Sequence, residues 1–282
     1  MLAGISDVAA TSLITLYCHA IETRSDNPIL VDLKSVEITA ELNKTLSRSE
    51  HPLEKALSSS TLDRNLVVHI AIRAKKYDDY VRDFLSQYPD GVVVNIGCGL
   101  DSRFLRIDNG RVAFWDLDLP EIIAIKKGFF RESERYHLIA SSVLDYGWMT
   151  HVRRHKGPYL FLAEGVFMYF DGDDVRSLVL EIKKTFPGSE LVCEVENSLW
   201  LGPLTKKMVG YKLQHQFHLG KDVIFRSGIS DSREMEQWQS GIQFLDQWSY
   251  FDSDEKKLGW LRLLRYIGWI RKTQWTVHYR LG

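Results

Sequence analysis

The stretch VVVNIGCG at positions 92–99 decides the fold of this chain of 282 residues. Its first five residues form a largely β-branched, apolar run that is typical of a strand buried on both faces of a sheet. Gly97 and Gly99 follow at once, so the strand is expected to end in a tight glycine turn. In open parallel sheets such a turn lies at the carboxyl edge, where ligands bind.

Strands and helices are predicted to alternate on both sides of this stretch. Upstream, residues 66–88 carry apolar side chains at helical spacing and end at the turn 89–91, which predicts a long helix. The same patterns predict strands at residues 111–118, 137–140, 159–163 and 190–196, and helices at residues 120–130 and 173–186. Alternating strands and helices imply right-handed crossovers and a parallel sheet.

The N-terminal part of the chain adds helices to this core. Residues 6–23 and 32–46 are predicted helices, and the Ser-rich residues 47–60 are predicted to form a surface loop. We therefore divide the chain into an N-terminal helical cap, residues 1–65, and a main domain, residues 66–282.

The C-terminal third is less regular. Residues 199–238 have no clean period and are interpreted as an insertion that forms a lid over the site. Residues 242–251 alternate as a strand, residues 255–272 predict a helix, and residues 274–280 predict a closing antiparallel strand. The predicted fold is α/β: a doubly wound, mostly parallel, Rossmann-like sheet of seven strands, with a helical cap and an inserted lid.

Composition narrows the classes of function. Lys and Arg number 36 against 37 Asp and Glu, so no global basic charge would attract nucleic acid. The sequence contains no run of about 18 apolar residues that could span a membrane. Asp7 precedes the apolar N-terminal stretch and no Lys or Arg does, which is not the pattern of a signal peptide. Cys18, Cys98 and Cys193 are far apart and lack metal-ligand spacing, which favours a reducing, cytoplasmic location.

The glycine turn indicates a ligand site. Glycine permits positive φ and a close approach of the backbone to a ligand, although short Gly-x-Gly turns also occur as plain structural turns. Asp118 ends the next predicted strand, where an acidic side chain can accept both ribose hydroxyls of an adenosine. The alternative for Asp118 is a helix N-cap before Pro120.

The details of the turn favour S-adenosylmethionine over a dinucleotide. A dinucleotide site would need a third glycine, but position 102 is Ser. Asp101 places a negative charge in the turn, which would repel a pyrophosphate. The ammonium and sulfonium groups of S-adenosylmethionine are positively charged and would not be repelled.

Three segments carry a family resemblance: GCGLDSR at 97–103, WDLDLP at 115–120 and AEGVFMY at 163–169. In this order and spacing they resemble the leucine carboxyl methyltransferase family, which includes the tetracenomycin-type polyketide O-methyltransferases. The resemblance covers about residues 11–186. It implies a class I S-adenosylmethionine-dependent O-methyltransferase, with S-adenosylhomocysteine as the product of the cofactor.

The resemblance also implies roles for individual residues. Arg73 matches the arginine that binds the cofactor carboxylate, with a solvated helix arginine as the alternative. Glu164 matches an acidic residue near the cofactor amino group and the substrate mouth, and Tyr169 would form a wall of the same pocket. These two are the implied catalytic residues. The implied cofactor-binding residues are Arg73, Gly97, Cys98, Gly99, Asp101, Asp118, Leu119, Ser142, Val143 and Glu164.

Two positions depart from the family pattern. Ser142 and Val143 stand at the adenine-binding step, where the family usually has Asp, so the Ser hydroxyl and the backbone would make that contact. His19 stands where an arginine is common in relatives. Both departures bear on cofactor affinity and on the choice of acceptor.

The cofactor implies the mechanism. Its sulfonium methyl group is already activated, so transfer to an oxygen needs proximity, alignment and exclusion of water. A carboxylate acceptor needs no base, whereas a phenol would need one, for which His19, His215 and His218 are candidates. A surface position is the commoner case for each of these histidines. His215 and His218 lack a third ligand, so no metal is expected.

The acceptor is the least defined part of the prediction. We expect a carboxylate of a small, polyketide-like molecule or of a peptide, with a phenol or a non-catalytic adenosyl-binding role as alternatives. Tryptophans of the C-terminal third could form an aromatic pocket, although core or sheet packing is the favoured interpretation for Trp238, Trp248, Trp260, Trp269 and Trp275. Lysines of the lid could attract an anionic acceptor or form a solvated face: Lys206, Lys207, Lys212 and Lys221.

Overall fold

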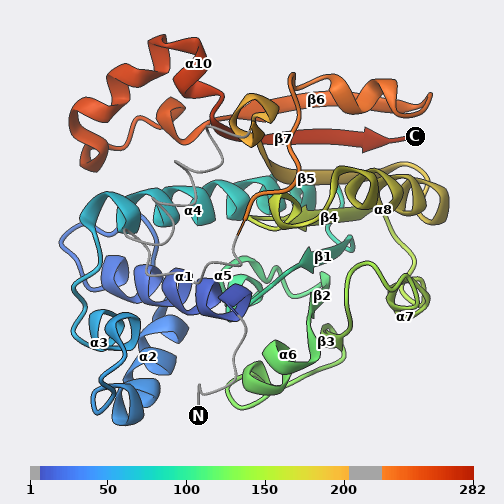
Figure 1. Cartoon of the computed structure of the whole chain (residues 1–282). Helices are drawn as coiled ribbons and strands as arrows, with labels where there is room; N and C mark the ends of the chain where they lie inside the picture. Colours follow the sequence, from blue (N-terminus) through green and yellow to red (C-terminus); the bar gives the residue numbers. More distant parts are fainter. Residues whose placement is uncertain (1–6, 203–223) are drawn as a thin grey trace.

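The computed structural model describes residues 7–202 and 224–282, and within them a seven-stranded sheet forms the centre of the molecule (Figure 1). The strands are β1 (Val92–Ile96), β2 (Ala113–Asp118), β3 (Tyr136–Ala140), β4 (Tyr159–Ala163), β5 (Ser189–Glu196), β6 (Ile242–Trp248) and β7 (Gln274–Leu281). Their order across the sheet is β3-β2-β1-β4-β5-β7-β6. Neighbours from β3 to β5 are parallel, and β7 is antiparallel to β5 and β6. The predicted doubly wound, mostly parallel fold is confirmed.

Helices cover both faces of the sheet because its strands are apolar on both sides. The α-helices are α1 (Asp7–Thr23), α2 (Leu33–Leu46), α3 (Pro52–Ser58), α4 (Arg64–Gln87), α5 (Arg103–Ile107), α6 (Pro120–Lys126), α7 (Trp148–Val152), α8 (Gly172–Thr185) and α10 (Gly268–Arg271). The 3-10 helices are η1 (Phe167–Tyr169), η2 (Ser198–Leu201), η3 (Glu234–Gln237), η4 (Tyr250–Asp252) and η5 (Lys256–Tyr266). Val93 of β1 packs into one core with α1, α2 and α4, whereas Val92 and Val94 pack into a second core with α7 and α8.

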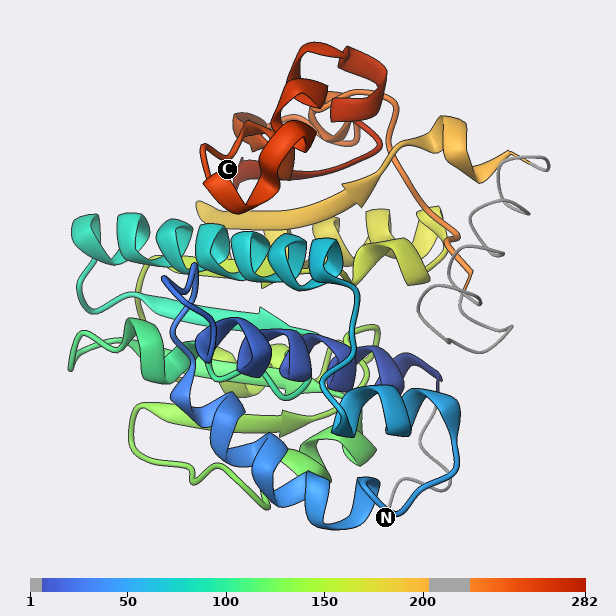
Figure 2. The same ribbon diagram turned by 90° about the vertical axis from the view of Figure 1, so that its left-hand side faces the viewer.

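The N-terminal helices lie directly against the main domain. Figures 1 and 2 show α1 alongside α4, on the same face of the sheet. Buried side chains of α1, among them Leu13 and Tyr17, share one hydrophobic core with Tyr77 of α4 and Val93 of β1. This packing holds α1 close to the glycine turn that follows β1, where Ser12 is the residue that a Cβ atom at Gly99 would meet.

Residues 47–60 are corrected from a loop to a segment that contains a helix. Helix α3 begins at Pro52, which is favourable at the first helical position because it needs no amide partner there. Leu53 and Leu57 lie four residues apart on one side of the helix, and both are buried. The two leucines lie in a stretch rich in serine, and that composition predicted a loop instead.

Residues 255–272 do not form the single helix that their periodicity predicts. The 3-10 helix η5 is interrupted at Gly259, which has a φ of 56° and a ψ of −129°. The short helix α10 follows after Ile267. Leu258 is the buried residue of η5, whereas Trp260, Leu263 and Tyr266 are exposed, so one buried side chain is too little to stabilise a continuous α-helix here.

The hydropathy of the helices and the state of the three cysteines were the remaining features that the sequence singled out. Among the residues that it describes, no helix combines the length and the hydropathy that crossing a membrane requires. Cys18, Cys98 and Cys193 are free thiols in buried positions. Burial raises the pKa of the Cys98 thiol well above its ordinary value, so this thiol stays protonated.

Candidate active site

A cavity of about 490 Å³ lies at the carboxyl ends of β1, β2 and β4. This is the edge at which open parallel sheets bind their ligands. Every residue of the implied cofactor-binding set lines this cavity, and so does Tyr169. The structure therefore brings the separate sequence motifs together at one site.

The turn after β1 requires glycine at two positions. Gly97 and Gly99 have φ values of 63° and 50°, in the left-handed region. A Cβ atom at Gly97 would lie 2.5 Å from Val166 Cγ2, and one at Gly99 would lie 2.9 Å from Ser12 Cβ. Neighbouring elements thus pack onto the bare backbone of a turn that also lines the cavity.

Asp118 ends β2 with its carboxylate directed to the backbone of the glycine turn. Its Oδ2 accepts a hydrogen bond of 2.7 Å from Gly99 N, and its Oδ1 accepts one of 2.7 Å from Leu119 N. Burial raises the pKa of Asp118, and these two hydrogen bonds oppose the rise. The N-cap of α6 is Leu119 and no side chain caps that helix, so the N-cap interpretation of Asp118 is wrong. Each carboxylate oxygen keeps a lone pair that a ribose hydroxyl can use.

Arg73 of α4 bridges two carboxylates at the cavity wall. Its Nε lies 2.8 Å from Glu164 Oε1, and its Nη1 lies 3.0 Å from Glu194 Oε2. The side chain is 11% exposed, so the alternative of a solvated helix arginine is wrong. Burial opposes its charge, but Glu194 and Glu164 hold the pKa of Arg73 above its ordinary value. Within the described residues no hydrogen bond engages Arg73 Nη2, which leaves that nitrogen for a cofactor carboxylate.

A second arginine, Arg103, binds the other oxygen of Glu164. Arg103 is 1% exposed, and its Nη2 lies 2.6 Å from Glu164 Oε2. Its Nη1 lies 2.9 Å from Asp101 Oδ2, and Arg106 Nη2 lies 3.0 Å from Asp101 Oδ1. The charge of Asp101 is therefore compensated, and the argument that it would repel a pyrophosphate is wrong. The choice of cofactor rests on the other motifs.

Sequence reasoning missed three charged residues of this site. Glu194 lies in β5, Asp78 lies in α4, and Arg103 begins α5; each is buried. Arg103 Nε lies 2.8 Å from Asp78 Oδ1, which fixes α5 to α4. The available signal was a charged residue within a stretch predicted to be buried, since such residues are nearly always paired.

Predicted cofactor-binding residues also lie at the ends of β3 and β2. Ser142 and Val143, the predicted adenine contacts, line the cavity after β3, and Leu119, another implied cofactor-binding residue, lines it after β2. Ser142 Oγ accepts a hydrogen bond of 3.3 Å from Leu144 N, and the carbonyl of Val143 accepts one of 3.0 Å from the Trp148 indole. The loop that carries Ser142 is thus held in place, and its contact with adenine stays a prediction.

Aromatic side chains form another wall of the cavity. The Tyr169 and Phe225 rings lie 5.8 Å apart, and His69 stacks on Tyr250 at 4.1 Å. Burial raises the pKa of Tyr169 to about 12, so this phenol keeps its proton near neutral pH. Burial would raise the pKa of Glu164, but Arg103 and Arg73 lower it, and both of its oxygens accept from guanidinium groups. Neither predicted catalytic residue is arranged as a proton acceptor.

The C-terminal tryptophans are not part of the cavity wall as far as the structure describes it. Trp275 is buried and donates a hydrogen bond of 3.0 Å to Ser232 Oγ, in line with the packing interpretation. Trp260 and Trp269 are exposed, so core or sheet packing is wrong for these two. Predicted lid residues that lie outside the described part of the chain are Lys206, Lys207, Lys212, His215, His218 and Lys221.

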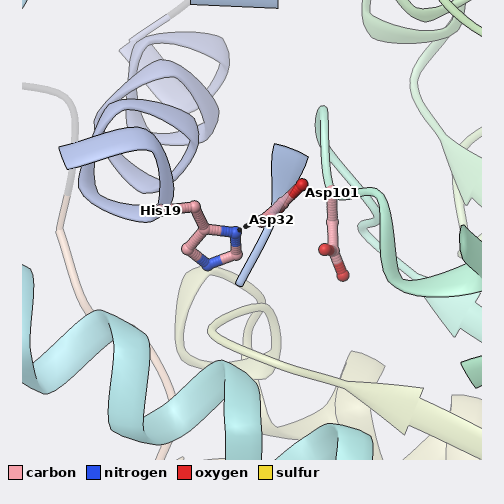
Figure 3. Close-up of side chains that lie close together, drawn as sticks. All are labelled: His19, Asp32 and Asp101. Carbon is pink, nitrogen blue, oxygen red and sulfur yellow. Dashed lines mark hydrogen bonds and ion pairs between the residues drawn. The ribbon is translucent and has the colours of Figure 1, made fainter. Parts of the chain in front are cut away.

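His19 of α1 is not a surface residue, which corrects the commoner-case expectation. It is 2% exposed, it lines the cavity, and its Nδ1 lies 3.1 Å from Asp32 Oδ2 (Figure 3). Asp32 also accepts hydrogen bonds from Ser102 Oγ at 2.5 Å and from Ser35 N at 3.0 Å. Burial would raise the pKa of Asp32, but His19, Arg106 and Ser102 hold it at about 2. Asp32 is therefore an ionised partner of the imidazole.

The ligand atoms of His19, Asp32 and Asp101 lie within 4.8 Å of one another, a spacing that a metal ion could use (Figure 3). Arg106 already binds both carboxylates, with Nη1 3.1 Å from Asp32 Oδ2 and Nη2 3.0 Å from Asp101 Oδ1. Arg103 adds a second guanidinium group beside Asp101. The cluster therefore fits a hydrogen-bonded Asp–His pair better than a site for a divalent cation.

Two solved structures share the fold. A DUF574 family protein from Streptomyces avermitilis aligns with a TM-score of 0.56 and 11% identity, over 86% of this chain and 96% of that one. A protein from Thermobifida fusca aligns with a TM-score of 0.54 and 11% identity, over 95% and 94%. The strand order and the helices on both faces are those of the class I methyltransferase fold, and the glycine turn beside Asp118 lies at its ligand-binding edge.

Sequence comparison then assigns the family. Residues 12–183 match the profile of the leucine carboxyl methyltransferases, and the chain belongs to that family. It is 28% identical over 250 residues to the tetracenomycin polyketide synthesis O-methyltransferase of Streptomyces glaucescens, spanning 88% of this chain and 85% of that protein. It is 28% identical over 273 residues to an S-adenosyl-L-methionine-dependent methyltransferase of Gibberella zeae, spanning 92% and 89%. The cofactor is S-adenosylmethionine, as the glycine turn and Asp118 predicted.

Proposed function

We propose that this methyltransferase transfers the methyl group of S-adenosylmethionine to an oxygen atom of a small, largely apolar molecule. Beyond the cofactor-binding residues, the cavity is lined by Leu66, Ile70, Met168, Tyr169, Phe170, Phe225 and Tyr250. Apolar and aromatic walls of this kind suit a planar, polyketide-like acceptor. The relative from Streptomyces glaucescens, an O-methyltransferase of polyketide synthesis, supports the same acceptor class.

In this proposal, charged side chains of the cavity wall bind the two ends of the cofactor and so orient it. Asp118 takes the ribose hydroxyls at the end of β2, and Arg73 Nη2 takes the methionine carboxylate. Glu164 then lies close to the methionine ammonium group, as the family resemblance implies. With both ends of the cofactor fixed, the methyl group is held for in-line attack in a site that excludes water.

The acceptor is either a carboxylate or a hydroxyl group. The family resemblance favours a carboxylate of a small molecule or of a peptide, because a carboxylate attacks without a base. The observation that favours a hydroxyl is the pairing of charges: Arg73 and Arg103 are the cavity residues with a fixed positive charge in the described chain, and carboxylates already bind both. Among the described residues, a second anion beside the cofactor would find no unpaired cation in the cavity wall. We therefore place a phenolic hydroxyl first and a carboxylate second.

A matched pair of acceptors tests this ranking. The protein is incubated with S-adenosylmethionine labelled in the methyl group and with either 2-naphthol or 2-naphthoic acid, which differ in the acceptor group. A labelled ether that survives mild base supports a hydroxyl acceptor, and a base-labile ester supports a carboxylate. Tight cofactor binding without transfer, across a wider panel of aromatic alcohols and acids, would favour the non-catalytic adenosyl-binding role.

A further inference from the structure

One nitrogen of the His19 imidazole is hydrogen-bonded to Asp32, and the other has no hydrogen-bond partner in the described chain. Nδ1 lies 3.1 Å from Asp32 Oδ2, and Asp32 is itself fixed by Ser35 N at 3.0 Å and by Arg106 Nη1 at 3.1 Å. An ionised carboxylate can only accept, so the hydrogen bond requires a proton on His19 Nδ1. In the neutral ring, Nε2 then carries a lone pair.

The nitrogen that carries this lone pair has no partner in the described chain. His19 Nε2 is fully buried and makes no hydrogen bond. Figure 3 shows it on the side of the ring away from Asp32. Because a buried polar atom without a partner is unfavourable, such atoms are rare in folded proteins and need an explanation. The ring lines the same cavity as Arg73 and Glu164, so a bound molecule can supply the missing donor.

We propose that His19 is the general base of the reaction, that Asp32 is its positioning residue, and that the acceptor is therefore a neutral phenol or enol. The hydroxyl proton moves to His19 Nε2 while the oxygen forms a bond to the methyl carbon. The carbon–sulfur bond breaks with its electron pair on sulfur, which leaves neutral S-adenosylhomocysteine. The imidazolium then releases the proton to solvent. This inference rests on the proposed oxygen transfer.

The charged groups around His19 suit this role. Three carboxylates interact with the ring: Asp32 from the residue before α2, Asp101 from the glycine turn and Glu164 from the end of β4. Arg103 and Arg106 of α5 bind Asp101 and Asp32, respectively. The carboxylates stabilise the imidazolium that forms when the proton is taken. A carboxylate acceptor brings no proton, so it would leave His19 without a role as a base.

The tautomer of His19 tests the proposal without any acceptor. The protein is labelled with ¹⁵N-histidine, saturated with S-adenosylhomocysteine and measured by NMR at about pH 8, with His19→Asn assigning the signal. The amide of Asn still reaches Asp32 but lacks a counterpart of Nε2. A neutral ring protonated on Nδ1 is the expected result. A proton on Nε2 overturns the proposal.

Cofactor affinity separates a base from a cofactor ligand. His19→Asn should change the affinity for S-adenosylhomocysteine by less than about twofold, because a general base need not touch the cofactor. A loss of about tenfold or more would make His19 a cofactor ligand and overturn the proposal. Failure of the unaltered protein to bind S-adenosylhomocysteine would instead contradict the cofactor site, which is a separate result.

Turnover of 2-naphthol gives the kinetic test. His19→Asn should lower kcat by roughly a hundredfold or more, in the range of general-base catalysis. With 2,4-dinitro-1-naphthol, which ionises without help, the same variant should lose less than about tenfold. The exposed His151→Asn variant serves as a control and should keep full activity. Equal losses with both acceptors, or methylation of 2-naphthoic acid alone, would contradict the assignment.

Discussion

The carboxylate of Asp118 accepts a hydrogen bond of 2.7 Å from the backbone N–H of Gly99. This contact joins the carboxyl end of β2 to the glycine turn after β1. The two strands are neighbours in the sheet. It explains why the two motifs occur together in the sequence. The same carboxylate both fixes the turn and presents its remaining lone pairs to the cavity.

Removal of the Asp118 carboxylate should weaken cofactor binding. Asp118→Ala is expected to raise the dissociation constant of S-adenosylhomocysteine by an amount equivalent to about 1–3 kcal/mol, the scale of hydrogen bonds to a charged group. Isothermal titration calorimetry measures this change. Asp173→Asn, an exposed position in the first turn of α8, is the control and should leave the affinity unchanged. Equal affinities for the two variants would remove Asp118 from the cofactor site.

Gly97→Ala should destabilise the protein because the new Cβ meets Val166 Cγ2 at 2.5 Å and the residue has a φ of 63°. We expect the free energy of unfolding to fall by about 1–3 kcal/mol, measured by urea denaturation. Adding Val166→Ala to the Gly97→Ala variant should restore the part of the lost unfolding free energy that the clash with Val166 causes. Gly172→Ala is the control, since its Cβ would meet nothing within 4 Å. A loss as large in that control would mean that the effect is not specific to the turn.

Arg73→Met should affect stability as well as cofactor binding. The substitution leaves Glu164 and Glu194 close together without the guanidinium group that binds both. Breaking a buried ion pair by removing one partner is expected to lower the free energy of unfolding by about 3–5 kcal/mol. Lys44→Met removes an exposed pair with Glu41 and should change stability by less than about 1 kcal/mol. Similar losses in both variants, measured by urea denaturation, would contradict a buried network at Arg73.

His137 should make the protein less stable in mild acid. Burial, followed by the neighbouring His155, lowers the pKa of His137 below the ordinary histidine value of about 6.5. The unfolded chain therefore binds more protons than the folded one as the pH falls through that value, so stability decreases with falling pH. His137→Phe keeps a ring beside Trp115 and should reduce this dependence, when unfolding is measured between about pH 7.5 and pH 5. The same slope in His137→Phe as in the unaltered protein would assign the effect to other groups.

Sequence predicted the parts of the site that depend on local geometry. The turn at Gly97 and Gly99 follows from a strand that ends in two glycines, and Asp118 follows from the end of the next strand. Arg73 could be assigned only through the family resemblance, because nothing in its helix distinguishes it from an exposed arginine. The structure adds the reason for its position, which is a pair of carboxylates, Glu164 directly after β4 and Glu194 within β5.

The parts that sequence missed depend on contacts between distant segments. His19 and Asp32 meet because the chain reverses between α1 and α2, and Ser102 joins them from beyond the glycine turn. No period or spacing indicates such a contact. Packing in the core or the sheet was also predicted for Trp260 and Trp269, as is usual for large apolar side chains, but the structure places no core against them within the described chain.

The most direct test of the account is a crystal structure of the protein with S-adenosylhomocysteine. The account predicts ribose hydroxyls within hydrogen-bond distance of Asp118, the methionine carboxylate at Arg73, and adenine beside Ser142 and Val143. The sulfur atom should face the part of the cavity that His19 and Tyr169 line. A cofactor bound elsewhere, or one whose ribose leaves Asp118 without contact, would contradict the assignment of the site.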